Sequence, residues 1–228
     1  MYSNINHIFF DLDHTLWDFD KNSGFAFERI FNENKIDINL QDFLHHYIPT
    51  NVKYWEMYRK DEITQSELRY GRLKETFNLI NYKTDESTIN FFSHQYIEYL
   101  PKFTELFEGA IETLDYLSKK YKLHIITNGF HEVQDKKMSN SNIKHYFKTI
   151  TNSEMAGVKK PNPIIFEHAL QKASAKKEES IMIGDCLEAD VGGALNFGMN
   201  AIFFNSNKIE INKDFNQINT LTELQKIF

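Results

Sequence analysis

The stretch HIFFDLDHTLWDF, residues 7–19, decides the fold of this chain. Its first four residues form a largely apolar run that predicts a buried strand, and Asp11 and Asp13 follow that run directly. Runs of this unalternating kind are typical of parallel strands that helices cover on both faces. The sequence contains four more of them, at residues 123–127, 148–151, 180–184 and 201–204. We therefore expect a parallel sheet whose first strand ends in paired carboxylates.

Helix-length segments separate these strands, which predicts α/β organisation with a doubly wound parallel sheet. Asn162 followed by Pro163 is typical of an N-cap and a first helical residue, and TLTE at residues 220–223 is a capping box for the final helix. The Asn- and Lys-rich residues 205–219 predict a loop. The expected helices of this region span residues 110–120, 131–140, 163–173 and 190–198.

The first two predicted strands lie too far apart for one βαβ unit. Thr15 and Thr127 are separated by 112 positions. Such a unit takes about 30 residues, so roughly 80 are inserted there. The inserted segment has helical patterns almost throughout, including a capping box TQSE at residues 64–67, and no convincing strand. We therefore predict an inserted α-helical cap of residues 18–100 and a core made of residues 1–17 and 101–228.

The composition argues against several classes of function. With 228 residues, of which 41% are hydrophobic, the chain can form one domain with a sizeable core and an insertion. The net charge of −6 removes the positive field that nucleic-acid or acidic-membrane binding needs. No apolar run approaches the ~20 residues of a membrane span, and the chain does not open with a signal-peptide pattern. The single cysteine, Cys186, excludes an internal disulfide. We expect a cytoplasmic protein with a small-molecule partner, and neither a nucleic-acid polymer nor a membrane.

The polar residues of interest fall where the predicted strands end. In an open parallel sheet, ligands bind outside the carboxyl ends of the strands, near the point where the strand order reverses. Lys160 comes just before a predicted helix start and so belongs to the same edge. The candidate site residues at this edge are therefore Asp11, Asp13, Thr127, Asn128, Gly129, Lys160, Asp185 and Asp190.

These residues carry a resemblance to a known family. In order and spacing, four short motifs resemble those of the haloacid dehalogenase-like superfamily of phosphoaspartyl transferases: DLDHT at 11–15, TNG at 127–129, KP at 160–161 and GDCLEAD at 184–190. The longer stretches FFDLDHTLWDF, ITQSELRYGRLKETF and ITNGF are similar to the pyrimidine-type 5'-nucleotidase branch of that superfamily. The resemblance implies a Rossmann-like core, a helical cap after the first motif, bound Mg²⁺ and hydrolysis of phosphate monoesters.

The charges at this edge are consistent with that chemistry. A phosphate monoester carries nearly two negative charges, and Asp11, Asp185 and Asp190 would add three more. At ~4 Å each like-charge pair costs on the order of 4 kcal/mol at a surface-like dielectric, so the ester needs a counter-charge to enter. A divalent cation and Lys160 supply it together. Because carboxylate oxygens suit Mg²⁺ better than zinc, we predict a Mg²⁺ cofactor.

The resemblance implies specific roles for the acids that follow the first and fourth predicted strands. Asp11 would attack phosphorus to form an aspartyl phosphate, while its other oxygen binds Mg²⁺. Asp13 would protonate the leaving group and later take a proton from the attacking water, and its backbone carbonyl would bind the metal. Asp185 would be the second side-chain ligand of the metal.

The resemblance also implies roles for the remaining residues at this edge. Lys160 would complete the catalytic set, with Asp190 holding either Lys160 or a metal-bound water. Thr127, Asn128 and Gly129 would bind the phosphoryl oxygens, whose negative charge grows during transfer.

We predict a Mg²⁺-dependent 5'-nucleotidase that acts on pyrimidine nucleoside monophosphates, and alternatives remain open. A sugar-phosphate phosphatase or a phosphomutase would use the same residues. A haloacid dehalogenase would need neither Asp13 nor a metal. A non-enzymatic phosphate-binding module would be expected to have lost Asp11, Asp13, Lys160 or Asp185, and none is lost.

The residues that would select the leaving group are less well defined by the sequence. Trp17, Phe19 and Phe130 flank the first two motifs, so that a nucleobase could stack on them, although packing explains such aromatic residues equally well. Arg69 and Arg72 lie three positions apart on one predicted helix. They could reach one ligand together or be exposed surface charges.

Overall fold

The computed structural model describes residues 2–211 and 215–228. The chain divides into two compact units, a core of residues 1–19 and 104–228 and a second unit of residues 20–103. The second unit begins two residues later and ends three residues later than the cap expected from the sequence.

The core contains a six-stranded sheet in the order β3-β2-β1-β4-β5-β6, and every pair of neighbouring strands is parallel. The strands are β1 (His7–Phe10), β2 (Lys122–Thr127), β3 (Phe147–Asn152), β4 (Ser180–Gly184), β5 (Asn200–Phe204) and β6 (Gln217–Ile218). All five predicted strands are present, with ends within one residue of those expected. The prediction of a Rossmann-like, doubly wound parallel sheet is therefore confirmed.

Strand β6 lies in a segment that we predicted as a loop, residues 205–219, and that part of the prediction is wrong. The strand has only two residues, too few for a hydrophobic pattern to reveal it. It exists because Phe203 and Phe204 at the edge of β5 offer it backbone partners. Residues 212–214 of the predicted loop lie outside the described residues.

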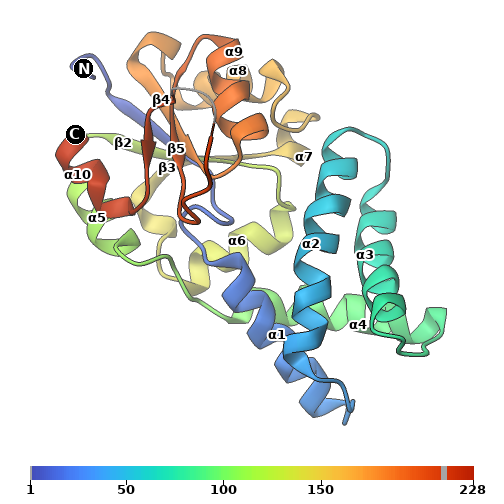
Figure 1. Ribbon diagram of the computed structural model, residues 1–228. Helices are drawn as coiled ribbons and strands as arrows, with labels where there is room; N and C mark the ends of the chain where they lie inside the picture. Colours follow the sequence, from blue (N-terminus) through green and yellow to red (C-terminus); the bar gives the residue numbers. More distant parts are fainter. Residues whose placement is uncertain (1, 212–214) are drawn as a thin grey trace. The chain divides into compact units, whose positions relative to one another are not determined.

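Helices cover both faces of this sheet. In Figure 1, α8 and α9 lie on one side of it and α5 and α10 on the other. The helices of the core are α5 (Ala110–Leu117), α6 (His131–Asn140), α7 (Ser153–Ala156), α8 (Pro163–Ala173), α9 (Gly193–Phe197) and α10 (Leu224–Ile227). Short 3₁₀ turns lie at Lys144–Tyr146 before β3, at Lys177–Glu179 before β4 and at Leu221–Glu223 before α10.

The helix predictions for the core are accurate where capping signals are present. Helix α8 has the expected bounds, with Asn162 as N-cap accepting from the Ile164 amide. The capping box at Thr220 is also present, although it opens a 3₁₀ turn before α10. The helix expected at 190–198 is instead a π-helical turn, η4 (Leu187–Gly192), followed by α9. The π-turn arises because the amides of both Asp190 and Val191 bond to the Cys186 carbonyl.

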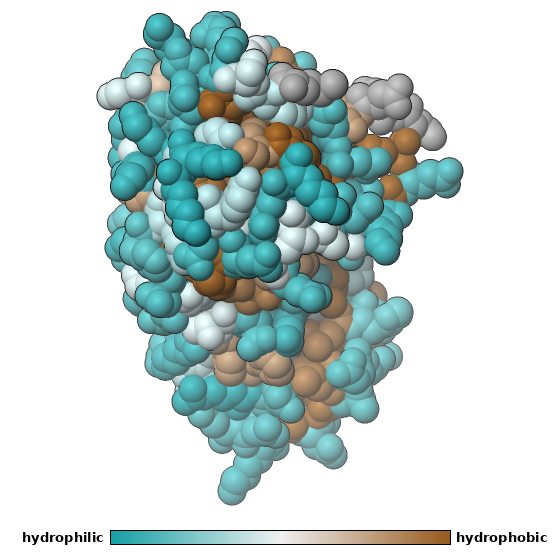
Figure 2. Space-filling model, turned by 90° about the vertical axis from the view of Figure 1, so that its left-hand side faces the viewer, coloured by the Kyte–Doolittle hydropathy of each residue, from teal (hydrophilic) through white to brown (hydrophobic). Residues whose placement is uncertain are grey.

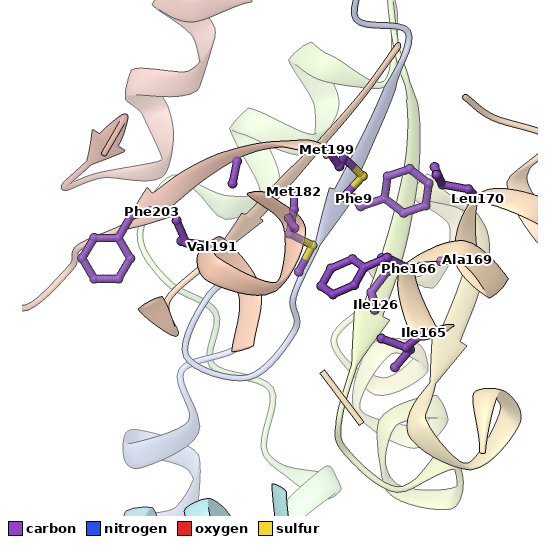
Figure 3. Packing of buried hydrophobic residues seen from close by; sticks show 12 residues of the cluster. Phe9, Ile126, Ile165, Phe166, Ala169, Leu170, Met182, Val191, Met199 and Phe203 are labelled. Atoms are coloured by element: carbon purple, nitrogen blue, oxygen red, sulfur yellow. The ribbon is translucent and has the colours of Figure 1, made fainter. Parts of the chain in front are cut away.

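One hydrophobic cluster joins α8 and the segment after β4 to the face of the sheet. Figure 3 shows the ring of Phe166 beside Met182 and the ring of Phe9 beside Met199. All four side chains are essentially fully buried. Complete burial of a side chain of this size contributes about 1.5 to 3 kcal/mol, so the cluster holds α8 firmly against β1, β2 and β4.

The strand order reverses at β1. The chain runs from β1 through β2 to β3 on one side, and from β4 through β5 to β6 on the other. Residues Phe10 and Ile183 are paired in the register of β1 and β4. The residues that follow these two strands, Asp11 and Asp185, therefore emerge next to each other at the carboxyl edge, where open α/β sheets bind ligands.

The second unit is helical throughout and has no strand; all of its residues are described. Its helices are α1 (Phe19–Glu33), α2 (Leu40–Arg59), α3 (Gln65–Leu79) and α4 (Glu86–Tyr99), followed by a 3₁₀ turn at Leu100–Lys102. Helix α3 starts at the predicted capping box of Thr64 and Glu67. Phe27 is central to the core of this unit, and its ring centroid lies 4.6 Å from that of Tyr47 and 4.6 Å from that of Tyr96.

Arg72 of α3 is part of this aromatic core. The side chain is only 3% exposed, donates to Asn51 Oδ1 at 2.8 Å and lies 5.0 Å from the ring centroid of Tyr96. The interpretation of Arg72 as an exposed surface charge is therefore wrong. A guanidinium is accommodated here because its planar face packs on the aromatic ring while its edge hydrogen-bonds.

Two histidines form a buried pair on β1 and β2. His7 Nδ1 lies 3.0 Å from His124 Nε2, and His124 Nδ1 lies 2.8 Å from Thr149 Oγ1. One ring must donate and the other accept, so the pair fits only while at least one of the two rings is neutral. Burial, and next the neighbouring His7, lower the pKa of His124 to about 3.

This pair predicts a loss of stability on acidification. The pKa of His124 is lower in the folded chain than in the unfolded chain, where it is near 6.5. As the pH falls from 7 the unfolded chain takes up the proton first, and stability is lost. Between pH 7 and pH 5 we expect the wild type to lose on the order of 1 kcal/mol more free energy of unfolding than His124→Gln does. Urea denaturation at both pH values measures this, and parallel losses in the two proteins would contradict it.

No helix among the described residues combines the length and the apolar character needed to span a bilayer. On the face shown in Figure 2, hydrophilic residues predominate and hydrophobic ones are interspersed among them.

Candidate active site

Asp11 emerges from β1 into the carboxyl edge of the sheet. Its amide continues the ladder by donating to the Ile183 carbonyl at 2.9 Å, which fixes the backbone at this position. The residue is 7% exposed, and its Oδ1 lies 2.5 Å from Lys160 Nζ. A carboxylate is thus held at the switch point of the sheet, against a buried ammonium group.

Lys160 joins three parts of this edge. Besides Asp11, its Nζ contacts Asp190 Oδ1 at 2.6 Å and donates to the Ile126 carbonyl at 2.7 Å. Its backbone is held as well, because Asn128 donates from Nδ2 to the Lys160 carbonyl at 3.0 Å and accepts from the Lys160 amide at 2.8 Å. The TNG segment therefore positions the lysine through Asn128.

Asp185 follows β4 and is anchored by Thr15. The Thr15 hydroxyl donates to Asp185 Oδ1 and accepts from the Asp185 amide, both at 3.1 Å. Thr15 is fully buried. We did not assign it a role from the sequence, although its place as the last residue of DLDHT was a usable signal.

Asp190 reaches the site because η4 and Gly184 leave room for it. Its Oδ2 accepts from the Cys186 amide at 3.0 Å, and the residue is 1% exposed. A Cβ on Gly184 would come within 2.3 Å of that same oxygen. Any larger residue at 184 would therefore push the Asp190 carboxylate away from Lys160.

The carboxylates of Asp11, Asp185 and Asp190 form a cluster suited to a divalent cation. One oxygen from each lies within 4.8 Å of the others. The pKa of Asp11 is raised by burial, against the pull of Lys160, and burial and next Asp190 raise that of Asp185 to about 7. The pKa of Lys160 is raised by its two carboxylate partners, which outweigh its burial. One ammonium faces three carboxylates, so a hard divalent cation fits the remaining charge and the oxygen donors.

Asp13 points to helix α6 instead of this cluster. Its Oδ1 accepts from Lys137 Nζ at 2.6 Å, and its Oδ2 accepts from Gln134 Nε2 at 2.9 Å.

The Lys137 ammonium also lies 4.2 Å from the Trp17 ring centroid and 5.0 Å from that of Phe19. Trp17 and Phe19 are both buried and lie against Lys137, so their position favours the packing interpretation over base stacking.

Thr127 and Gly129 lie beside the same helix. Thr127 Oγ1 accepts from Gln134 Nε2 at 2.8 Å and from the Gly129 amide at 3.1 Å. A Cβ on Gly129 would come within 2.3 Å of Gln134 Nε2, so the close approach of Gln134 requires glycine there. Thr127 is thus linked to Asp13 through one amide group.

The structure brings together all the site residues expected from the sequence, in two groups. The first group contains Lys160 with Asp11, Asp190 and Asn128, and Asp185 belongs to it through the carboxylate cluster. In the second group, Gln134 contacts Asp13 and Thr127, and Thr127 accepts from the Gly129 amide. Sequence reasoning missed Gln134 and Lys137. Their spacing of three residues puts them on one helix face, but nothing local distinguishes Lys137 from its exposed neighbour Lys136.

Known proteins resemble this chain over most of its length. The family described as haloacid dehalogenase-like hydrolase matches residues 8–204. The pyrimidine 5'-nucleotidase PynA of Streptococcus pneumoniae is 31% identical over 89% of this chain and 85% of its own. The glyceraldehyde 3-phosphate phosphatase of Methanothermobacter thermautotrophicus is 31% identical over 94% of this chain and 92% of its own.

A solved structure is similar over the whole fold. The HAD-hydrolase YfnB of Bacillus subtilis, crystallised with bound magnesium, superposes with a TM-score of 0.87 and 25% identity, covering 98% of each chain.

Proposed function

Because the chain belongs to the haloacid dehalogenase-like hydrolase family, we propose that it is a Mg²⁺-dependent phosphatase of small phosphate monoesters, and that pyrimidine nucleoside 5'-monophosphates are its substrates. The observation that carries the proposal is the placement of Asp11 at the switch point, 2.5 Å from a buried lysine and within a cluster of three carboxylates.

The first chemical step belongs to Asp11. A carboxylate oxygen of Asp11 attacks phosphorus, a new P–O bond forms, and the ester P–O bond breaks. The leaving alkoxide takes a proton from Asp13. Lys160 holds Asp11 in place and offsets its charge, and the buried surroundings strengthen that pairing.

The second step releases phosphate. Asp13, now a carboxylate, takes a proton from a water molecule that attacks the same phosphorus. The bond between phosphorus and the Asp11 oxygen breaks and restores the free carboxylate. The Thr127 hydroxyl and the amides of Asn128 and Gly129 are the donors proposed for the phosphoryl oxygens.

The residues proposed to hold Mg²⁺ are Asp11, Asp185 and the backbone carbonyl of Asp13, with Asp190 supporting the site through Lys160. When bound, Mg²⁺ supplies positive charge to the phosphoryl oxygens as their negative charge grows. Thr15 keeps Asp185 oriented toward the cluster through its two hydrogen bonds.

A sugar-phosphate phosphatase or phosphomutase is the second candidate. Similarity to the glyceraldehyde 3-phosphate phosphatase favours it, at the same identity as the nucleotidase. The nucleotidase is preferred because FFDLDHTLWDF and ITNGF resemble that branch at the site itself. The dehalogenase alternative is disfavoured, since that reaction has no use for an acid such as Asp13.

A phosphate-release panel tests the substrate class. We expect the kcat/KM values of pyrimidine nucleoside monophosphates to exceed those of hexose phosphates and short-chain sugar phosphates by about tenfold or more, because a pocket of matched shape discriminates by 1 to 3 kcal/mol. Purine nucleoside monophosphates serve as the matched control for the base. If a sugar phosphate ranks first, the nucleotidase assignment is wrong and the phosphatase assignment stands.

A further inference from the structure

Helix α6 contributes two buried polar side chains that the reaction described above does not use. Gln134 is 1% exposed and Lys137 is 2% exposed. Burying an ammonium or an amide costs free energy unless partners replace the lost water. Both side chains find such partners at Asp13, a residue that lies more than a hundred positions earlier in the chain.

The ammonium group of Lys137 is held by the segment that starts with Asp13 itself. It contacts the Asp13 carboxylate at 2.6 Å, and the Trp17 and Phe19 rings lie within 5.0 Å. Aromatic faces attract a cation without competing for its hydrogen bonds. Lys137 is therefore held in one place relative to the carboxylate.

Gln134 occupies the other oxygen of Asp13. Its Nε2 has two hydrogen atoms to donate, and its contacts account for both, since Asp13 Oδ2 lies at 2.9 Å and Thr127 Oγ1 at 2.8 Å. Both oxygens of the Asp13 carboxylate thus accept from α6, and the carboxylate cannot rotate without losing one of these bonds. Nucleophile and acid are held by separate sets of side chains, Asp11 by Lys160 and Asp13 by α6.

We propose that Lys137 and Gln134 are positioning residues that fix the direction in which Asp13 transfers protons. This inference rests on the proposed function. General acid–base catalysis depends on reach, and an error of about 1 Å in such a group can cost on the order of a hundredfold in rate. Loss of Lys137 should therefore impair the steps that need Asp13 and spare the attack by Asp11.

Rapid-mixing kinetics with p-nitrophenyl phosphate separate these steps. The p-nitrophenolate leaving group needs little protonation, so formation of the aspartyl phosphate does not depend on Asp13, whereas its hydrolysis does. For Lys137→Met we expect formation within about threefold of the wild-type rate and hydrolysis slower by about tenfold to a hundredfold. The result is a burst of p-nitrophenol followed by slow turnover.

Matched variants make the result specific. Lys136→Met removes a lysine from the exposed side of the same helix and should behave as the wild type. Lys137→Arg keeps a positive charge beside the Asp13 carboxylate and the aromatic rings and should recover part of the lost hydrolysis rate. Gln134→Leu removes the second hydrogen-bond donor to Asp13 without removing a charge, and it should also slow hydrolysis. This variant provides the test if Lys137→Met does not fold.

The outcomes separate this inference from the proposed function. A burst with slow hydrolysis in Lys137→Met, together with faster hydrolysis in Lys137→Arg than in Lys137→Met, supports the positioning role. Wild-type turnover in Lys137→Met, or equal slowing of formation and hydrolysis, overturns it while the phosphatase activity of the wild type stands. A wild-type protein that releases no phosphate from any monoester overturns the proposed function, and this inference with it.

Discussion

The Asp13→Asn variant should release one burst of p-nitrophenol from p-nitrophenyl phosphate and then turn over slowly. Attack by Asp11 needs no help with this leaving group, but hydrolysis of the aspartyl phosphate still needs a base. We expect the burst to approach about one equivalent per active site, with a steady rate lower by about 10² to 10⁴. The trapped protein should carry an acid-stable, hydroxylamine-sensitive phosphoryl group.

Asp11→Asn is the matched control for this experiment. It likewise replaces a carboxylate by an amide, but it removes the nucleophile, so we expect neither burst nor adduct. The thermal melting of both variants should be compared with that of the wild type, because Asp13→Asn turns an NH₂ group toward Lys137 or Gln134, which are donors themselves. If Asp13→Asn turns over at the wild-type steady rate, Asp13 is not the base of the second step.

Removal of Mg²⁺ should abolish turnover. The reason is electrostatic: Asp11, Asp185 and Asp190 face one lysine, and the dianionic ester would add to an uncompensated negative charge. In excess chelator, with the protein shown to be metal-free, we expect the rate to fall by about a hundredfold or more, and Mg²⁺ to restore it. Full activity of the metal-free protein would contradict the charge argument.

The effect of Mg²⁺ on stability provides a readout that does not depend on activity. A cation that binds only the folded protein raises the melting temperature. Asp185→Asn should reduce that rise, and Glu188→Gln, which changes an exposed carboxylate outside the cluster, should leave it unchanged.

The effect of Mg²⁺ on the melting temperature should also depend on pH. The pKa of Asp185 is about 7 in the cluster, so protons compete with the cation for this carboxylate. The rise in melting temperature should therefore be smaller at pH 6 than at pH 8.

The strands and the candidate chemistry could be predicted from local sequence alone. Apolar runs such as residues 180–184 are buried on both sheet faces, and this burial is encoded within the run itself. The caps at Thr64 and Asn162 are equally local, since each bonds to an amide within three residues. The positions of Asp11, Asp13 and Asp185 at strand ends follow from the same runs, so the carboxyl edge was recognisable before the fold was known.

The tertiary structure alone decided which side chains meet at that edge. Lys137 contacts Asp13 across 124 positions of sequence, and Thr15 contacts Asp185 across 170. Lys136 and Lys137 are neighbours of identical type, yet one is exposed and the other is buried against two rings. The two-residue strand β6 exists only because β5 presents its edge. Such pairings depend on how segments far apart in the chain fold together. When a polar side chain is buried, a distant group takes the place of its hydrating water, and the residues next to it in sequence do not specify which group that is.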